Sequence, residues 1–179
     1  MPLPNGLAGA VMDRYPRFLA DLESLVNVDC GSYTHIGVNR VADAVAGALG
    51  SLGAEVQRLA PEPRPDGSRL GDLVIGRLAG EGPRLLLIGH MDTVFEEGTA
   101  AARPFTVREG RALGPGTSDM KGGLLAGLHA LAALRVIGLR PAVTFVANPD
   151  EEIGSPFSTP HIRRLVPEHD AALVLECAR

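Results

Sequence analysis

Apolar residues along the chain switch repeatedly between helical and strand-like spacing. Helical spacing, with apolar residues three and four apart, predicts helices over residues 7–27, 38–53, 118–138 and 159–166. Alternating or continuous apolar runs predict strands over residues 54–60, 72–80, 83–90, 141–148 and 171–176. The runs at 72–80 and 83–90 are interpreted as two adjacent strands, and residues 104–116 as a small hairpin. Strands that alternate with helices predict an α/β domain, layered α/β/α around a mixed, largely parallel sheet.

The helix predicted over residues 118–138 is unusually rich in small side chains. These are Gly122, Gly123, Ala126, Gly127 and Ala130. Small side chains let a helix approach its neighbours closely, so we expect this helix to pack tightly on the sheet.

Composition narrows the class of protein. The chain has 179 residues, of which 45% are hydrophobic, enough for one globular domain with its own core. A net charge of −4 offers no basic surface, so neither nucleic acid nor a membrane is expected as a partner. The sequence contains no signal-peptide pattern and no membrane-spanning run, and its two cysteines form no metal-type or redox-type pair. We therefore expect a soluble, cytoplasmic protein.

Residues able to bind a metal follow three of the predicted strands. His90 ends one strand, Glu151 and Glu152 follow another, and Glu176 ends the last. In open α/β sheets, ligands bind beyond the carboxyl ends of the strands. If these strands are parallel, their side chains gather on one rim, and Asp119 joins them from the start of the long helix.

The rim predicted in this way is strongly acidic, because Asp92 and Asp150 also belong to it. Lys121 is the only cation near it in the sequence, and we expect it to give local charge balance. Crowded carboxylates cannot all stay ionised without a counter-charge, so either some are protonated or a divalent metal is bound. One histidine with several carboxylates suits zinc, or manganese or cobalt. Asp92, two residues after His90, lies on the same side of an extended backbone and would fix the orientation of the imidazole.

Four motifs in order carry a family resemblance. They are "GHMDTV" at 89–94, "GPGTSDMKGG" at 114–123, "NPDEEIGS" at 148–155 and "LVLE" at 173–176. The chain resembles the co-catalytic zinc metallopeptidases that include glutamate carboxypeptidase, acetylornithine deacetylase, succinyl-diaminopimelate desuccinylase and aminoacylase. The glutamate carboxypeptidase branch is the most similar, judging by "HMDTVF" and the loop to "GPG".

The resemblance implies two bound Zn²⁺ ions, with Co²⁺ or Mn²⁺ as alternatives. Their ligands would be His90, Asp119, Glu152 and Glu176, with Asp119 bridging the two ions. It also implies a cis peptide bond between Asp119 and Met120. The remaining histidines match no motif position; they are His35, His129, His161 and His169.

The resemblance assigns the catalytic roles to Asp92, which would brace His90, and to Glu151, the general base on a water activated by the two metals. It implies hydrolysis of an amide bond beside a carboxylate-bearing residue, as in a carboxypeptidase or an N-acyl amino acid deacylase. The substrate would be a small peptide or an N-acyl amino acid. Asp150 is expected to cap the loop or to support the metal ligands.

Members of this family are much longer than 179 residues. In them a lid and dimerisation domain follows, and the catalytic domain then resumes with a further histidine ligand. Residues 1–179 are thus expected to be the N-terminal portion of a catalytic domain, from a parent that forms a homodimer through the missing domain. A fragment, an engineered N-terminal piece and a naturally truncated protein all remain open. The alternative function is a catalytically incomplete metal-binding fragment or pseudogene product, and we expect the chain alone to be a poor enzyme.

Overall fold

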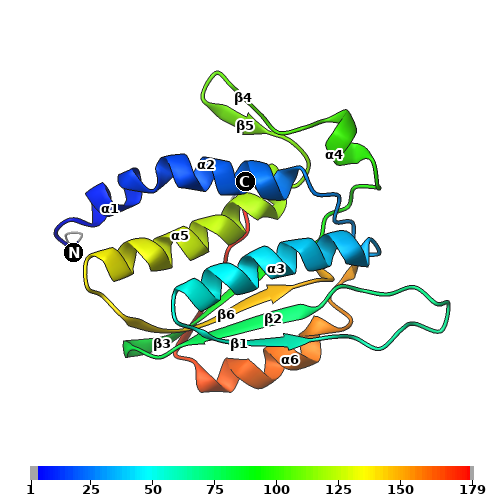
Figure 1. Ribbon diagram of the computed structural model, residues 1–179. Helices are drawn as coiled ribbons and strands as arrows, with labels where there is room; N and C mark the ends of the chain where they lie inside the picture. The colour runs from blue at the N-terminus through cyan, green and yellow to red at the C-terminus, as the bar shows by residue number, and fades with distance from the viewer. Residues whose placement is uncertain (1–3, 178–179) are drawn as a thin grey trace.

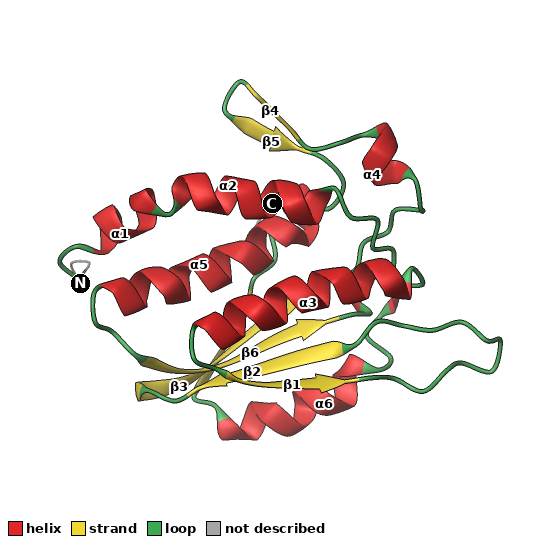
Figure 2. Ribbon diagram, in the orientation of Figure 1, coloured by secondary structure: helices red, strands yellow, loops and turns green. Residues whose placement is uncertain are grey.

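The computed structural model describes residues 4–177, which form one five-stranded sheet with helices on both faces (Figures 1 and 2). The strands of this sheet are β1 (Glu55–Leu59), β2 (Leu73–Leu78), β3 (Glu81–His90), β6 (Pro141–Asn148) and β7 (Ala171–Val174). A separate hairpin consists of β4 (Thr106–Arg108) and β5 (Arg111–Leu113), as predicted. The layered α/β/α architecture with a mixed sheet is therefore confirmed.

The strand order in the sheet is β1-β2-β6-β3-β7. Strands β6, β3 and β7 run parallel, whereas β2 is antiparallel to both of its neighbours. The strands predicted over residues 72–80 and 83–90 correspond to β2 and β3. They were expected to be adjacent in the sheet, and this expectation is wrong because β6 lies between them. The parallel arrangement brings the carboxyl ends of β3, β6 and β7 to one rim, where His90 pairs with Asn148.

The helices lie in two layers. They are α1 (Leu7–Asp13), α2 (Tyr15–Val26), α3 (His35–Ser51), α4 (Thr99–Ala102), α5 (Gly122–Val136) and α6 (Ser158–Leu165). Helices α3 and α5 pack against one face of the sheet, α1 and α2 pack on α5, and α6 covers the other face (Figure 1). The single helix predicted over residues 7–27 is broken at Arg14. Pro16, in the first turn of α2, has no backbone N–H to donate to the preceding turn, so the first helix ends before it.

Each face of the sheet has its own apolar core. The larger core joins α2, α3 and α5 to the sheet and includes the fully buried Val41, Leu49 and Phe145. The smaller core lies under α6 and contains Leu73, Ile75, Leu86, Val146 and Leu165. β2, β3 and β6 are therefore covered on both faces, which is why they read as nearly continuous apolar runs.

The long helix begins later than predicted. Residues Thr117–Lys121 form a wider turn in which Asp119 and Met120 have non-helical backbone angles, and α5 starts at Gly122. Within α5, a Cβ on Gly123 would lie 1.9 Å from the carbonyl oxygen of Leu175. A Cβ on Gly127 would likewise come too close to the side chain of Leu175.

Close packing of the long helix on the sheet thus depends on two of the small residues, Gly123 and Gly127. Ala126 and Ala130 instead face solvent, so the expectation was wrong for them. In the described part of the chain, no helix combines the length and apolar character needed to cross a membrane.

Candidate metal centre

His90 is the buried residue around which the rim is built. It ends β3, in register with Asn148 of β6, and only 1% of its side chain is exposed. Its backbone N–H donates to the sulfur of Met120 at 3.1 Å. The imidazole is therefore fixed in place, with one nitrogen facing the rim and the other facing Asp92.

Two carboxylates from distant parts of the chain converge on Nε2 of His90. The distance to Oδ1 of Asp119 is 3.0 Å and the distance to Oε1 of Glu176 is 3.1 Å. One ligand atom from each of the three residues lies within 4.8 Å of the others. Oε2 of Glu151 lies 3.9 Å from the same nitrogen. The peptide bond between Asp119 and Met120 is cis, as the family resemblance implies.

This donor set fits a divalent ion. Zinc holds nitrogen and oxygen ligands at roughly 2.0–2.2 Å in a tetrahedral arrangement, which places neighbouring ligand atoms about 3.4 Å apart. The separations of Asp119 and Glu176 from His90, 3.0 and 3.1 Å, are close to this spacing. The centre also opens to solvent, since 60% of the Asp119 side chain is exposed.

Lys121 does not balance this charge, contrary to expectation. Its side chain is buried, and its ammonium donates to the backbone carbonyl of Val28 at 3.0 Å. Among residues 4–177, the only ion pairs made by Asp119, Glu151 and Glu176 are with His90. The acidic rim therefore lacks a lysine or arginine partner within the described chain.

The pKa of His90 reflects this surplus of negative charge. Burial alone would lower it, but the hydrogen bond to Asp92 and the charges of Asp92, Glu176 and Glu151 outweigh burial and raise the pKa to about 9. A proton on the imidazole thus supplies the cation that the carboxylates require, and a metal ion would replace this proton. The pKa of Glu152 is raised by burial first and then by the charges of Asp119, Asp92 and Glu151, with His90 opposing them.

Asp92 contacts both His90 and the turn that follows β6, and so supports the centre. Nδ1 of His90 lies 2.9 Å from the backbone carbonyl oxygen of Asp92 and 3.3 Å from Oδ1 of Asp92. The carboxylate accepts hydrogen bonds from the backbone N–H groups of Glu151, at 3.1 Å, and Glu152, at 3.2 Å. Asp92 therefore ties the end of β3 to the turn that follows β6.

Ser32 is a supporting residue that sequence reasoning missed. Its hydroxyl donates to Oδ2 of Asp92 at 2.7 Å, and both side chains are buried. It lies 60 residues away in the chain, in a loop without a recognisable motif. No local signal in the sequence could have connected it to the rim.

Asp150 closes the loop between β6 and α6, which is one of the two roles expected for it. Its Oδ2 accepts the backbone N–H of Phe157 at 2.6 Å and that of Ser158 at 3.3 Å, at the start of α6. Its backbone carbonyl accepts the N–H of Ser155. Asp150 thus ties the turn that carries Glu151 and Glu152 to the start of α6.

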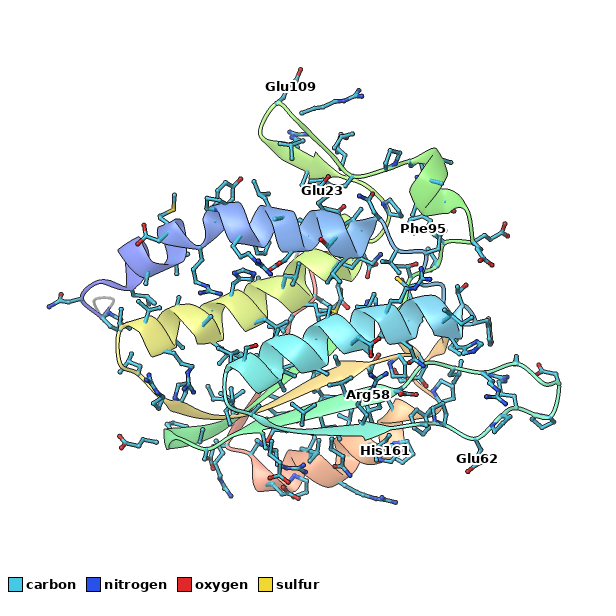
Figure 3. All side chains as sticks on the ribbon, viewed as in Figure 1. Glu23, Arg58, Glu62, Phe95, Glu109 and His161 are labelled. Carbon is cyan, nitrogen blue, oxygen red and sulfur yellow. The ribbon has the colours of Figure 1, made fainter. Side chains whose placement is uncertain are left out.

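The structure brings together three of the four ligands expected from sequence: His90, Asp119 and Glu176. Glu152 lies beside them, held through its backbone by Asp92, but its carboxylate is not part of that three-residue group. The other histidines lie elsewhere. His161 projects from α6 on the far face of the sheet (Figure 3), where it packs against Phe157.

Comparison with known families agrees with this geometry. The profile of "Peptidase family M20/M25/M40" matches residues 86–177, which contain all of the rim residues described above. Carboxypeptidase G2 of Pseudomonas sp. (strain RS-16) is 37% identical over 154 residues, covering 84% of this chain and 36% of that protein. Acetylornithine deacetylase of Photorhabdus laumondii is 31% identical over 147 residues, covering 78% of this chain and 37% of that protein.

Solved structures give the same fold. Human carnosine dipeptidase 1 superposes with a TM-score of 0.83 at 20% identity, covering 96% of this chain and 41% of that one. At such low identity the likeness concerns the fold alone. The chain spans little more than a third of the length of the two relatives named above.

Proposed function

The chain belongs to peptidase family M20/M25/M40, and from this premise we propose that it carries the metal-binding part of a hydrolase that cleaves amide bonds. One observation supports the proposal above the others. The side chains of Asp119, in the turn before α5, and Glu176, just beyond β7, converge on Nε2 of His90 at the end of β3, with no lysine or arginine partner in the described chain. An imidazole and carboxylates collected in this way suit a catalytic divalent metal.

We assign the ligands as follows. His90, Asp119 and Glu176 would hold one ion, and Asp119 with Glu152 would contribute to a second, so that Asp119 would belong to both ligand sets. Zinc is the expected metal, with cobalt or manganese as substitutes. When bound, the ions lower the pKa of a water molecule and polarise the carbonyl of the substrate.

Glu151 is the proposed general base. Its carboxylate is about half exposed and lies at the mouth of the centre, 3.9 Å from Nε2 of His90. A carboxylate there can accept a proton from the attacking water and deliver it to the leaving amine. Asp92 fixes the backbone of Glu151 and the ring of His90 together, so it is a positioning residue.

The substrate class is a small peptide or an N-acyl amino acid. Carboxypeptidase G2 and acetylornithine deacetylase, both named above, represent these two types of reaction. We further propose that residues 1–179 correspond to the N-terminal portion of a longer catalytic domain, since the chain spans little more than a third of these relatives. The longer protein would form a homodimer through a lid domain.

Zinc titration of the metal-free chain tests the metal centre. We expect one tight site, and a second, weaker one that depends on Glu152. His90→Ala should abolish the tight site, whereas His161→Ala on the far face should leave it intact. If His90→Ala binds zinc as well as the parent chain, the assignment is wrong.

Hydrolysis of N-acyl and peptidyl glutamate by the zinc-loaded chain tests the activity. Glu151→Gln should keep zinc affinity and reduce any turnover by about 10²–10⁴-fold, whereas Glu62→Gln, on an exposed loop in Figure 3, should change neither. Zinc binding without turnover would favour the second candidate, a metal-binding chain that is catalytically incomplete by itself. Turnover that survives Glu151→Gln would refute the role of this residue as the base.

A further inference from the structure

Lys121 is one of the largest fully buried side chains in the described chain, with 1% of its surface exposed. A lysine is almost never fully buried unless it is paired, yet Lys121 makes no ion pair among residues 4–177. Its ammonium donates instead to the backbone carbonyl of Val28 at 3.0 Å. Burying a charge costs free energy, and an apolar side chain of the same length would fill this space without that cost. What Lys121 contributes is therefore its hydrogen bond.

The segment at residues 28–32, which accepts this hydrogen bond, also holds the end of β3. The carbonyl oxygen of Cys30 accepts the N–H of Thr93 at 2.9 Å. The hydroxyl of Ser32 donates to Oδ2 of Asp92 at 2.7 Å. The end of β3 and the turn before α5 are therefore attached to the same short segment of the chain.

Side chains from these two parts of the metal centre meet beside Gly116. A Cβ on Gly116 would lie 2.7 Å from Cγ2 of Thr93 and 3.3 Å from Cδ of Lys121. Burial raises the pKa of the Cys30 thiol, and the charge of Lys121 together with hydrogen bonds with Lys121 and Thr93 opposes this effect. The thiol therefore lies beside both side chains. Lys121 is thus enclosed on all sides, and its length sets the distance between its turn and the segment at residues 28–32.

We propose that Lys121 is a positioning residue of the metal centre, because its hydrogen bond sets where the carboxylate of Asp119 lies relative to His90. Among residues 4–177, the only side-chain hydrogen bond of Asp119 is its contact with Nε2 of His90, which a bound ion would replace. The position of Asp119 then depends on the backbone of its turn, which is non-helical at Asp119 itself. Lys121 anchors that turn to the segment at residues 28–32. The inference rests on the proposed function, since it concerns the same centre.

Zinc titration of Lys121→Met is the first test. Methionine keeps the length of the side chain and removes its hydrogen-bond donors. We expect zinc affinity to fall about 10–100-fold, as it does when other groups that orient metal ligands are lost. Leu49→Val is the control for a core change elsewhere, because Leu49 lies about 21 Å along α3 from the first residue of that helix. It should lower the urea midpoint of unfolding and leave zinc affinity unchanged.

A double-mutant cycle separates positioning from a general loss of stability. Lys121→Met and Ser32→Ala each release one contact of the segment at residues 28–32, so their effects on zinc affinity should be coupled. The double variant should lose clearly less affinity than the product of the two single losses. A second readout needs no substitution. Because coupling between two sites is reciprocal, zinc should slow the proton exchange of the Lys121 ammonium in the ¹⁵N-lysine-labelled parent chain.

Three outcomes overturn the role of Lys121. They are zinc affinity in folded Lys121→Met equal to that of the parent chain, single losses that simply multiply in the cycle, and ammonium exchange that zinc does not slow. The exchange measurement uses the parent chain, so it decides the question even if Lys121→Met does not fold. A parent chain that binds no zinc would refute the proposed metal centre and this inference with it, whereas the three outcomes above refute only the role of Lys121.

Discussion

Replacing Asp92 by Asn gives the sharpest test of how the metal centre is supported. The substitution keeps the size of the side chain but turns one acceptor oxygen into an NH₂ donor. Oδ2 accepts from Ser32 and from the N–H of Glu152, and Oδ1 accepts from the N–H of Glu151. In either orientation of the Asn amide, a donor must face a donor inside a buried site.

The size of the effect follows from these contacts. A hydrogen bond to a charged group contributes about 1.5–3 kcal/mol, and a buried donor left without a partner costs about 1–3 kcal/mol. The less damaging orientation sacrifices one such bond, so the metal-free chain should lose about 2–4 kcal/mol of its free energy of unfolding. Loss of a group that orients a metal-binding histidine typically weakens metal binding 10–100-fold. We expect zinc affinity to fall within that range.

Urea unfolding followed by circular dichroism measures the first quantity, since the chain contains no tryptophan for fluorescence. Competition with a chromophoric chelator measures zinc affinity. Ser32→Ala should shift both quantities in the same direction by a smaller amount, because the carboxylate keeps its two backbone donors.

Asp170→Asn is the matched control. It makes the same chemical change in a half-exposed ion pair with Arg84, where the loss of stability should be small and zinc affinity should not change. If Asp92→Asn behaves like Asp170→Asn in both measurements, Asp92 does not support the centre in the way described.

Three further predictions concern the same rim. The pKa of His90 is raised from 6.5 to about 9. Its contribution to the stability of the metal-free chain is therefore complete below pH 6.5 and is lost as the pH rises through 9. Urea unfolding between these pH values should show the free energy of unfolding decline by about 3 kcal/mol, and His90→Gln should remove this decline. In the proposed site zinc would displace the same proton, so calorimetry should show zinc affinity rising with pH over this range. Burial and neighbouring carboxylates raise the pKa of Glu152, so at neutral pH Glu152→Gln should stabilise the metal-free chain by up to about 1 kcal/mol. It should also weaken the proposed second zinc site. A destabilised variant would contradict this reasoning. Gly123→Ala would place a Cβ against the carbonyl oxygen of Leu175. It should cost about 1–3 kcal/mol of stability and weaken zinc binding through the adjacent Glu176. As a control, Gly47→Ala in α3, where nothing lies within 4 Å, should leave zinc affinity unchanged and stabilise the chain by about 0.5–1 kcal/mol.

The rim itself could be predicted because it depends on strand ends. A residue that follows an apolar run is visible in the sequence, and parallel strands must bring their carboxyl ends to the same edge. His90 and Glu176 could be placed near each other by this argument alone, before any distance was known. The cis bond after Asp119 came from the family resemblance and not from the spacing of residues.

Other features could not be read from the sequence because they depend on contacts between distant segments. Ser32 reaches Asp92 across 60 residues, and the insertion of β6 between β2 and β3 leaves no trace in either strand. Lys121 follows the acidic turn directly, yet its long side chain crosses to the carbonyl of Val28. Local charge patterns show which groups are close in the chain, whereas packing decides where a flexible side chain finds its partner.

The position of β7 at the edge of the described sheet has a consequence for how fast a metal ion leaves. β7 has four residues, all exposed, and it pairs only with β3 among the strands described, whereas β3 and β6 are anchored in both cores. Short edge strands open locally at a lower free-energy cost than global unfolding. Glu176, just beyond β7, is therefore the proposed ligand that such fraying should withdraw first, whereas His90 should stay in place. The dissociation rate of the ion should follow the opening rate of this one strand, and a bound ion should in turn slow hydrogen exchange along β7 more than along β6.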